Sequence, residues 1–377
     1  QPTMQEIEQR FEAEYPNVDV QVTVTALEQY QVSLLTQLAA GTGPDVMYVL
    51  PGRANAISLV PLAESGNLLD LSGEAWTARI PGGFKGATEY EGKTYVYPTG
   101  QAMIGVLFNQ DVYDAAGLPL PATYDEVLEQ CDAFNAAGIT PIMLGNLTPW
   151  VPQLVTYNIV PSTVYSDPDF IRQQVAGETS FSASAGWHEA FDKTGEMIKR
   201  GCFNANTNGT TIDQMVEAVG QGKAAMTYML TAAVGRINPY VEQGVTFGMM
   251  PFPAVNDPSK IYVLASPLNS YGVYSKTKYP EEAKAFVEYM TRPEVMQLFI
   301  DASRDIPILT TDGLHVDPLL DRMLQAVAEG RSVGSPDAEW PNTMIQQEHI
   351  AVVQEFFAGS ITADQALARM DKAYNEE

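Results

Sequence analysis

The residue types that most often perform enzyme chemistry are sparse in this sequence and lack the spacing that catalysis needs. It contains two cysteines, Cys131 and Cys202, and three histidines, His188, His315 and His349. It has no G-x-S-x-G elbow, P-loop, H-E-x-x-H or G-x-G-x-x-G motif. A zinc site of the common type needs three or four nitrogen or sulfur ligands at set spacings, which this chain lacks. The sequence therefore predicts no catalytic residue, no metal site and no cofactor.

Paired carboxylates are the remaining route to catalysis, because two of them can hydrolyse a glycosidic bond. The chain has 46 Asp and Glu residues, so some carboxylates will always lie close together. Asp167 with Asp169, and Glu281 with Glu282, are typical of a solvated turn and a helix start. A carbohydrate-active hydrolase is thus the less favoured alternative.

The aromatic residues point to ligand binding instead. There are 4 Trp, 18 Tyr and 14 Phe. Sugars stack their apolar faces on aromatic rings, while their hydroxyls need amide, carboxylate or guanidinium partners. Trp150, in a loop after an apolar segment, and Trp340, before a helix start, are candidate stacking residues, with core packing as the alternative for both. Trp76 and Trp187 lie in or beside helical patterns, which favours core packing.

Composition limits the class of protein. The 377 residues are 45% hydrophobic, which suits two or three folded domains. The longest apolar runs are much shorter than the roughly 20 residues that a membrane helix needs. A net charge of −25 disfavours binding to nucleic acid and to anionic membranes.

The first fifty residues alternate between helix and strand patterns. Apolar residues at helical spacing predict a helix over 1–15, and Val at every second position predicts a half-buried strand over 18–24. A second helix is expected over 30–40, followed by a strand covered on both faces over 46–50. This order predicts a parallel sheet with crossover helices. Because such a unit starts with a strand, we also expect further residues upstream of Gln1.

Later segments follow the same alternation. Residues 90–97 predict a hairpin with a tight turn, and Thr123 with Glu126 predicts a capping box. Further helices are expected over 184–200, 212–221, 280–290, 293–302, 318–329, 342–358 and 362–375. Further strands are expected over 102–108, 224–229, 246–250 and 272–274. No Pro/Gly-rich linker is present, so two domains would be joined by strands that cross more than once.

Seven short segments follow one another in a characteristic order along nearly the whole chain. The most specific is 38–46 (LAAGTGPDV). The others are 11–20 (FEAEYPNVDV), 92–98 (GKTYVYP), 107–118 (LFNQDVYDAAGL), 121–126 (PATYDE), 222–226 (GKAAM) and 359–366 (GSITADQA). Together, these segments resemble one family, the carbohydrate-binding extracellular solute-binding proteins of ABC importers (maltose-binding-protein-like).

The resemblance implies an α/β fold of the two-lobe periplasmic-binding-protein type, with a hinge and an interlobe cleft. Lobe boundaries are expected at 1–100 plus 263–305 for the N-terminal lobe, and 101–262 plus 306–377 for the C-terminal lobe. Ligand would bridge the lobes and stabilise a closed state.

The resemblance also implies which residues contact the ligand. Stacking is expected from aromatic residues and hydroxyl contacts from polar ones. The expected ligand-binding residues are Arg53, Gln101, Trp150, Tyr228, Asn269, Tyr271, Asp305 and Trp340. The chain departs from the family's maltodextrin binders, since Ala102 replaces a ligand-binding glutamate and Tyr228 is the nearest substitute for a missing tryptophan.

An exported family with two cysteines in one lobe implies a disulfide between Cys131 and Cys202. The expected protein is a monomeric, non-enzymatic sugar-binding subunit that delivers its ligand to a membrane permease. It would be a periplasmic protein or a membrane-anchored extracellular lipoprotein. Glycerol-phosphate and polyamine ligands remain alternatives within this fold, as does a sensor domain that feeds a receptor.

Overall fold

The chain forms two units in the computed structural model, which describes residues 2–53, 55–81, 84–303, 306–309 and 311–376. The first unit is Gln1–Ala102 with Ser266–Val316, and the second is Met103–Ala265 with Asp317–Glu377. Strands β4 (Val96–Asn109) and β8 (Val263–Val273) each run from one unit into the other. The third passage lies at 316–317, later than the 305–306 boundary inferred above, because Ile306 pairs with Gln101 of the first unit.

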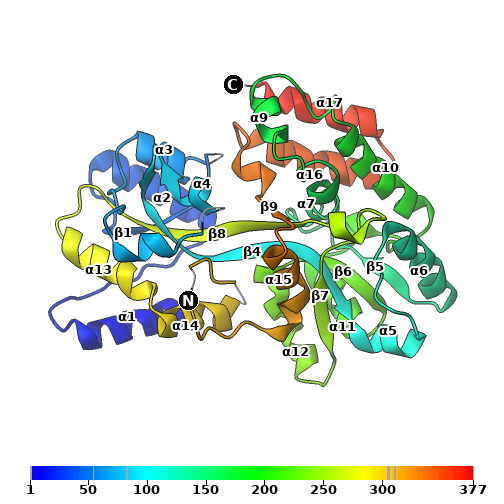
Figure 1. Cartoon of the computed structure of the whole chain (residues 1–377), viewed down its shortest axis with the longest axis horizontal. Helices are drawn as coiled ribbons and strands as arrows, with labels where there is room; N and C mark the ends of the chain where they lie inside the picture. The colour runs from blue at the N-terminus through cyan, green and yellow to red at the C-terminus, as the bar shows by residue number, and fades with distance from the viewer. Residues whose placement is uncertain (1, 54, 82–83, 304–305, 310, 377) are drawn as a thin grey trace. The chain divides into compact units, whose positions relative to one another are not determined.

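The first unit combines helices with short strands (Figure 1). Its other elements are α1 (Pro2–Glu14), α2 (Leu27–Ala40), β1 (Val46–Val49), α3 (Leu59–Glu64), η1 (Ala75–Arg79), α4 (Lys85–Thr88), β2 (Glu89–Tyr90), β3 (Lys93–Thr94), α13 (Pro280–Met290) and α14 (Pro293–Ser303). The helices predicted over 1–15, 30–40, 280–290 and 293–302 are confirmed.

The sheet of the first unit has the order β1-β8-β4. Strand β1 pairs antiparallel with β8, with Val46 opposite Val273 and Val49 opposite Ser270. The predicted parallel arrangement is therefore wrong for β1. It assumed that strands close in sequence pair with each other, whereas the chain returns from a distant segment to supply the neighbour of β1.

The strand predicted over 18–24 does not form. The alternation that suggested it is real, because Val18, Val20 and Val22 are half-buried while Asp19 and Gln21 are exposed. A strand, however, is defined by hydrogen bonds to a neighbour. Among the described residues no other segment pairs with 18–24, so periodicity alone overestimated the structure.

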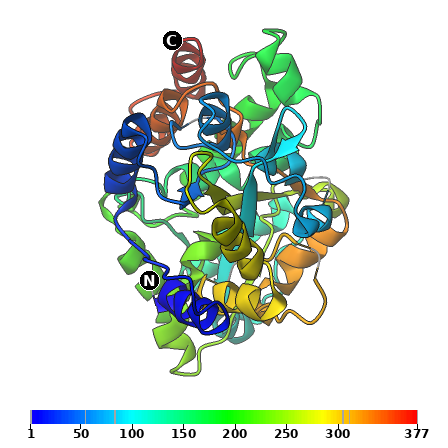
Figure 2. The ribbon, with the colours of Figure 1, turned by 90° about the vertical axis from the view of Figure 1, so that its left-hand side faces the viewer.

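Helix α1 lies beside α14 in both ribbon views (Figures 1 and 2). Its residues Ile7 and Phe11 are fully buried, as their spacing on one helix face predicts. The Phe11 ring meets Phe286 of α13 edge-on, with centroids 5.1 Å apart. A second core cluster contains Leu34 and Leu38 of α2.

The tight turn expected in 90–97 joins β2 to β3. Its two central residues, Glu91 and Gly92, have φ of 49° and 75°. Positive φ at both positions is the geometry that a two-residue hairpin prefers. The hairpin prediction is confirmed.

The second unit holds the remaining elements. Its helices are α5 (Gln110–Ala116), α6 (Tyr124–Ala136), α7 (Gln153–Tyr157), α8 (Val160–Thr163), α9 (Phe170–Val175), α10 (Ala185–Lys199), η3 (Thr207–Gly209), α11 (Ile212–Gly220), η4 (Thr231–Ile237), α12 (Asn238–Val241), η5 (Pro258–Lys260), η6 (Pro318–Leu320), α15 (Asp321–Ala328), η7 (Pro336–Ala338), α16 (Met344–Phe357) and α17 (Ala363–Tyr374). Its strands are β5 (Thr140–Met143), β6 (Ala224–Leu230), β7 (Phe247–Met250) and β9 (Ser332–Val333).

Its sheet is mixed. Strand β4 pairs antiparallel with β6 and β7, and β5 pairs parallel with β6. At the start of α6, Thr123 accepts a hydrogen bond from the Glu126 N–H at 3.3 Å, so the predicted cap forms. The reciprocal half of the capping box does not, because the Glu126 carboxylate accepts from the Ala122 N–H instead.

Cys131 of α6 and Cys202, which follows α10, are joined by a disulfide. Their Cα atoms lie 5.0 Å apart, inside the usual range for a bridged pair. Both residues are fully buried. This is the pairing that the family resemblance implied.

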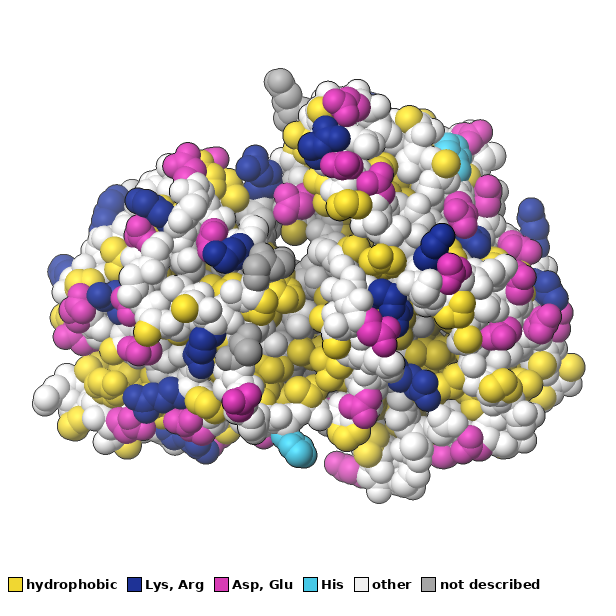
Figure 3. Space-filling model, viewed as in Figure 1, with side chains coloured by type: hydrophobic (Ala, Val, Ile, Leu, Met, Phe, Trp, Pro, Cys, Tyr) yellow, Lys and Arg dark blue, Asp and Glu magenta, His cyan; other side chains and the backbone are white. Residues whose placement is uncertain are grey.

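The net charge is spread over the surface. In Figure 3, acidic and basic side chains are interspersed over the visible face of each unit. Many of them form exposed ion pairs, such as Arg200 with Asp132 at 2.6 Å. The acidity therefore suits solubility and marks no single-sign binding patch on that face.

Candidate functional site

One face of the sheet in the first unit carries aromatic and amide side chains. Tyr48 and Tyr271 lie directly opposite each other in the β1–β8 ladder, with ring centroids 6.2 Å apart. The Tyr48 hydroxyl donates a hydrogen bond to Asn269 Oδ1 at 3.1 Å. The Thr99 hydroxyl donates to the backbone carbonyl oxygen of Asn269 at 3.3 Å. The structure thus joins two residues that the sequence predicted, Asn269 and Tyr271, with two that it missed.

Tyr48 points toward this cluster because its neighbours in β1 point to the opposite, buried face of the strand. Met47 and Val49 are 1% and 0% exposed, and successive side chains of a strand point to opposite faces. Tyr48 itself is half-buried, which corrects the expectation that both faces of this strand are covered. A polar-tipped aromatic residue between two aliphatic ones was the signal that could have identified it.

The phenols of this cluster are hydrogen-bond donors at physiological pH. The Tyr30 hydroxyl donates to the backbone carbonyl oxygen of Tyr48 at 2.9 Å. Burial raises the pKa of Tyr30 well above its usual value and raises the pKa of Tyr271 to about 12. The rings therefore remain neutral and supply both apolar faces and O–H groups.

Gln101 lies in β4, two residues after Thr99. Its backbone N–H donates to the carbonyl oxygen of Ile306 at 2.7 Å, and the Ile306 N–H donates back at 3.2 Å. The side chain is 4% exposed, and its Oε1 atom has no hydrogen-bond partner among the described residues. A buried amide oxygen in this state is an acceptor suited to a ligand hydroxyl.

Arg53 lies in the loop that follows β1, which is closed by the bridge between Leu50 and Ser58. It is exposed, and the structure gives its guanidinium no hydrogen bond or ion pair with a described residue. Arg53 is therefore a free cation near the end of the strand that carries Tyr48. Asp305, predicted as a hydroxyl partner, lies outside the described residues.

The second unit has a polar group that includes Gln153, three residues after the predicted Trp150. Trp150 is half-buried in the turn before α7, and Gln153 is the first residue of that helix. The Gln346 amide nitrogen lies 3.2 Å from Gln153 Oε1 and donates to Asp337 Oδ2 at 2.7 Å. The Ser335 hydroxyl donates to the other Asp337 oxygen.

Sequence analysis missed Gln153, Asp337 and Gln346. They meet because α7, which carries Gln153, packs against α16, which carries Gln346. Asp337 comes from η7, just before α16. No spacing in the chain signals these contacts. Burial raises the pKa of Asp337, although hydrogen bonds from Ser335 and the backbone oppose the shift. The arrangement brings a carboxylate and two amide groups together, and one of the amides, Gln153, lies three residues after Trp150 in the chain.

Tyr228 and Trp340 do not belong to such a surface. Tyr228 is fully buried in β6, with the Phe252 ring 5.3 Å away. Trp340 is 1% exposed, with Phe181 and His349 each 5.9 Å from its ring. The predicted stacking role does not hold for these two residues, because core packing covers their rings. For Trp340, core packing was the stated alternative, because a position before a helix start is equally typical of an interior residue.

Neither a metal nor a membrane span emerges from the part of the chain that the structure describes. No cluster of three or more His, Cys, Asp or Glu side chains there could hold a metal ion. No helix there has the length and apolar character needed to cross a bilayer.

Comparison with known proteins decides the family. A family model described as bacterial extracellular solute-binding protein matches residues 1–297. The chain belongs to this family. A curated relative is the multiple sugar-binding protein of Streptococcus mutans, 24% identical over 313 residues, which are 79% of this chain and 70% of that protein.

Solved members of this solute-binding fold cover nearly the whole chain. The apo form of RafE from Streptococcus pneumoniae has a TM-score of 0.83 at 23% identity, covering 99% of this chain and 94% of that one. A sugar transporter protein from Bacillus licheniformis in complex with stachyose has a TM-score of 0.76 at 21% identity, covering 98% and 94%. The mixed α/β architecture is thus that of two-lobe solute-binding proteins.

Proposed function

We propose that this chain is the sugar-binding subunit of an ABC importer, and that it binds its ligand without catalysis. The observation that carries the proposal is the cluster of aromatic and amide groups in the first unit. In the first unit Tyr48 and Tyr271 adjoin Asn269, and in the second Trp150 precedes Gln153 in the chain. Aromatic rings can stack on the apolar faces of a sugar, and adjacent amide groups can bond to its hydroxyls.

Relatives with sugars in their names support the same conclusion. One is named a multiple sugar-binding protein, and a structural neighbour holds stachyose. We propose an oligosaccharide or smaller sugar as the ligand here. Tyr48, Asn269, Tyr271, Gln101 and Arg53 would contact it from the first unit. Trp150, Gln153 and Asp337 would contact it from the second.

The alternative ligands fit these side chains less well. A glycerol phosphate favours several cations around its phosphate, and the proposed contacts include one guanidinium, Arg53. A polyamine favours several carboxylates, and the proposed contacts include one, Asp337. Glycoside hydrolysis needs two carboxyl groups across the scissile bond, which this set does not supply.

The importer role follows from differential binding. A sugar that binds one conformation more tightly shifts the population toward it, by no more than the difference in binding free energy. The permease of the importer would read the loaded conformation. The protein would be exported, as a periplasmic protein or a lipid-anchored lipoprotein.

A thermal-shift screen tests the proposal directly. Raffinose, stachyose and shorter sugars are compared with glycerol 3-phosphate, spermidine and short peptides. Ligand at 100 times its Kd adds about 2.7 kcal/mol to stability, which is an easily measured shift. A shift with one sugar class supports the proposal, whereas a shift with a control alone rejects the sugar. Formation of product from any bound sugar would contradict the non-enzymatic role.

Replacing Trp150 by alanine is expected to weaken sugar binding by roughly 1–3 kcal/mol, because a stacking surface is lost. Isothermal titration calorimetry with the sugar found in the screen measures the loss. Leu147→Ala is the matched control, since Leu147 is 54% exposed in the same loop and has no proposed contact. If Trp150→Ala binds normally but melts much earlier, Trp150 is a packing residue.

A further inference from the structure

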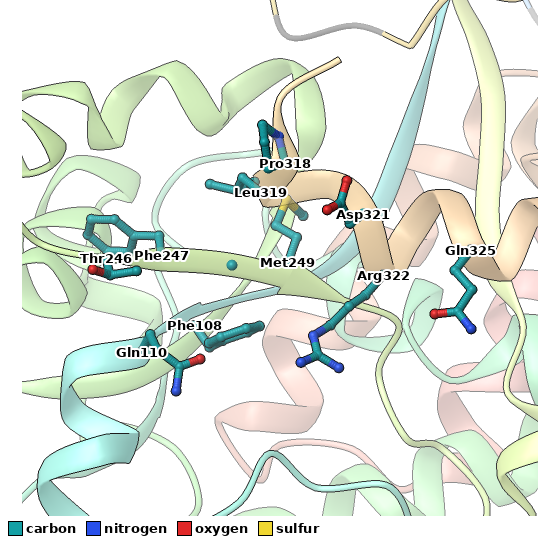
Figure 4. A pocket seen from close by; sticks show the side chains of 11 residues that line it. Phe108, Gln110, Thr246, Phe247, Met249, Pro318, Leu319, Asp321, Arg322 and Gln325 are labelled. Carbon is teal, nitrogen blue, oxygen red and sulfur yellow. The ribbon is translucent and has the colours of Figure 1, made fainter. Parts of the chain in front are cut away.

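A pocket of about 450 Å³ lies on the second unit, apart from every residue proposed above to contact sugar. It is formed where η6 and α15 pass the edge of strand β7. In Figure 4, the side chains of Arg322 and Phe108 lie on one side of that strand. Those of Phe247, Met249 and Leu319 lie on the other.

Arg322 brings a free positive charge to this pocket. Every other described arginine except Arg53 donates to a carboxylate or to another oxygen, as Arg236 does to Asp213 at 2.5 Å. The structure gives Arg322 no such partner within its described residues. The carboxylate of neighbouring Asp321 points away from the Arg322 guanidinium in Figure 4. In a chain with net charge −25, an unpaired guanidinium in a pocket is available to an anionic ligand.

Apolar side chains form the walls. Phe108 lies opposite Gly248 in the β4–β7 ladder, and a Cβ atom at Gly248 would come within 2.3 Å of the Phe108 ring. Glycine therefore lets this ring lie against the strand. Met249 is fully buried beneath the other side, and Phe247 and Leu319 are half-buried. An apolar ligand group would gain contact area on the half-buried Phe247 and Leu319.

Two glutamines line the pocket with amide oxygens that can accept hydrogen bonds. The Gln110 amide nitrogen donates to Asp114 Oδ1 at 2.7 Å, and the Gln325 amide nitrogen donates to Glu329 Oε1 at 2.9 Å. These bonds occupy an N–H of each amide and engage both carboxylates. The amide oxygens of Gln110 and Gln325 remain as acceptors for a ligand N–H.

We propose that this pocket is a second ligand site, which binds a carboxylate bearing an apolar side chain and an adjacent N–H group. The guanidinium of Arg322 matches the carboxylate, the glutamine oxygens match the N–H, and the walls match the side chain. This chemistry is shared by free apolar amino acids and by the C-terminal residue of a peptide. The site is independent of the proposed sugar ligand.

The test uses the full chain and three fluorinated probes observed by ¹⁹F NMR titration. N-acetyl-4-fluoro-L-phenylalanine represents a peptide end, and 4-fluoro-L-phenylalanine represents a free amino acid. N-acetyl-4-fluoro-L-phenylalanine amide lacks the carboxylate. At least one of the two acids is expected to bind, at least tenfold more tightly than the amide. The acid that binds more tightly identifies the source of the ligand.

Arg322→Gln is expected to weaken binding of that acid at least tenfold. Arg236→Gln is the matched control, because Arg236 belongs to the same unit and lies outside the pocket. It should change the affinity less than twofold, as should Trp150→Ala. Three results would overturn the proposal: no binding of either acid, equal binding of the amide, or equal affinities of the two arginine variants. If the acid instead binds at the sugar-contact residues, Trp150→Ala would bind it more weakly.

Discussion

Replacing Cys131 and Cys202 together by alanine is expected to lower the free energy of unfolding by about 4 kcal/mol. The bond joins residues 71 positions apart, so it removes much of the freedom of the unfolded chain. It also links helix α6 to the segment after α10, both parts of the second unit. Since both side chains are fully buried, alanine also leaves space in the core, which adds to the loss.

Urea unfolding of the second unit, followed by fluorescence of its tryptophans, measures this difference. The control is to repeat the measurement with a reducing agent. The reducing agent should lower the urea midpoint of the natural chain and leave the midpoint of the double variant unchanged. Free-thiol titration of denatured, unreduced protein gives an independent count, and two reactive thiols there would contradict the bond. The importer role does not depend on this result, because the sugar-contact residues are elsewhere.

Acidification is expected to destabilise the second unit through His349. This residue is fully buried, and the Trp187 and Tyr157 rings lie 5.7 and 5.0 Å from it. The Thr156 hydroxyl donates to the Gln153 carbonyl oxygen at 3.1 Å, so it accepts a hydrogen bond from His349 Nε2 at 2.6 Å. That assigns the proton of the neutral imidazole to Nε2. A second proton would have to enter at Nδ1, which is buried without a described partner.

The direction of the pH effect follows from the two pKa values. Burial lowers the pKa of His349 from 6.5 to about 3 in the folded chain. Between these values the unfolded state binds a proton that the folded state does not. The contribution of His349 to the free energy of unfolding is therefore complete above pH 6.5 and decreases as the pH falls toward 3. The slope is about 1.4 kcal/mol per pH unit, or roughly 5 kcal/mol over the whole window.

Comparison with His349→Gln isolates this contribution. Glutamine can still donate to Thr156 but does not titrate, so the stability difference between the two chains should change with pH by the slope above. Asp337, whose pKa is raised by burial, acts in the opposite direction in both chains and cancels. Parallel profiles for His349→Gln and the natural chain would refute the assignment.

Local sequence signals were sufficient for many helices. The spacing of Ile7 and Phe11 placed α1, and Pro280 and Pro293 marked the starts of α13 and α14. Such signals work because a helix satisfies its backbone hydrogen bonds within one segment. Strands lack that property, and the 18–24 segment shows the consequence. Its alternation is present, but none of the described segments pairs with it.

Some residues of the candidate site could likewise be identified from the sequence, and others only from tertiary contacts. Asn269, Tyr271 and Trp150 could be named from the chain because the family resemblance implied that these positions contact the ligand. Tyr48 could not, since its importance comes from standing opposite Tyr271 in a ladder between distant segments. Gln153, Asp337 and Gln346 meet across almost two hundred residues, and no local pattern encodes that contact.

The sequence by itself therefore determined the family, the two-lobe α/β class, most helices and the absence of the common catalytic motifs. These depend on residue types, local spacing and the order of short segments. Only the tertiary structure decided which way the sheet pairs, which aromatic rings are core and which polar groups meet. Burial of Trp340 and Tyr228 against other rings, and exposure of part of Tyr48, result from packing between elements distant in the chain. Because packing depends on all the neighbours of a side chain at once, a residue's own spacing does not reveal whether it will face a ligand or the core.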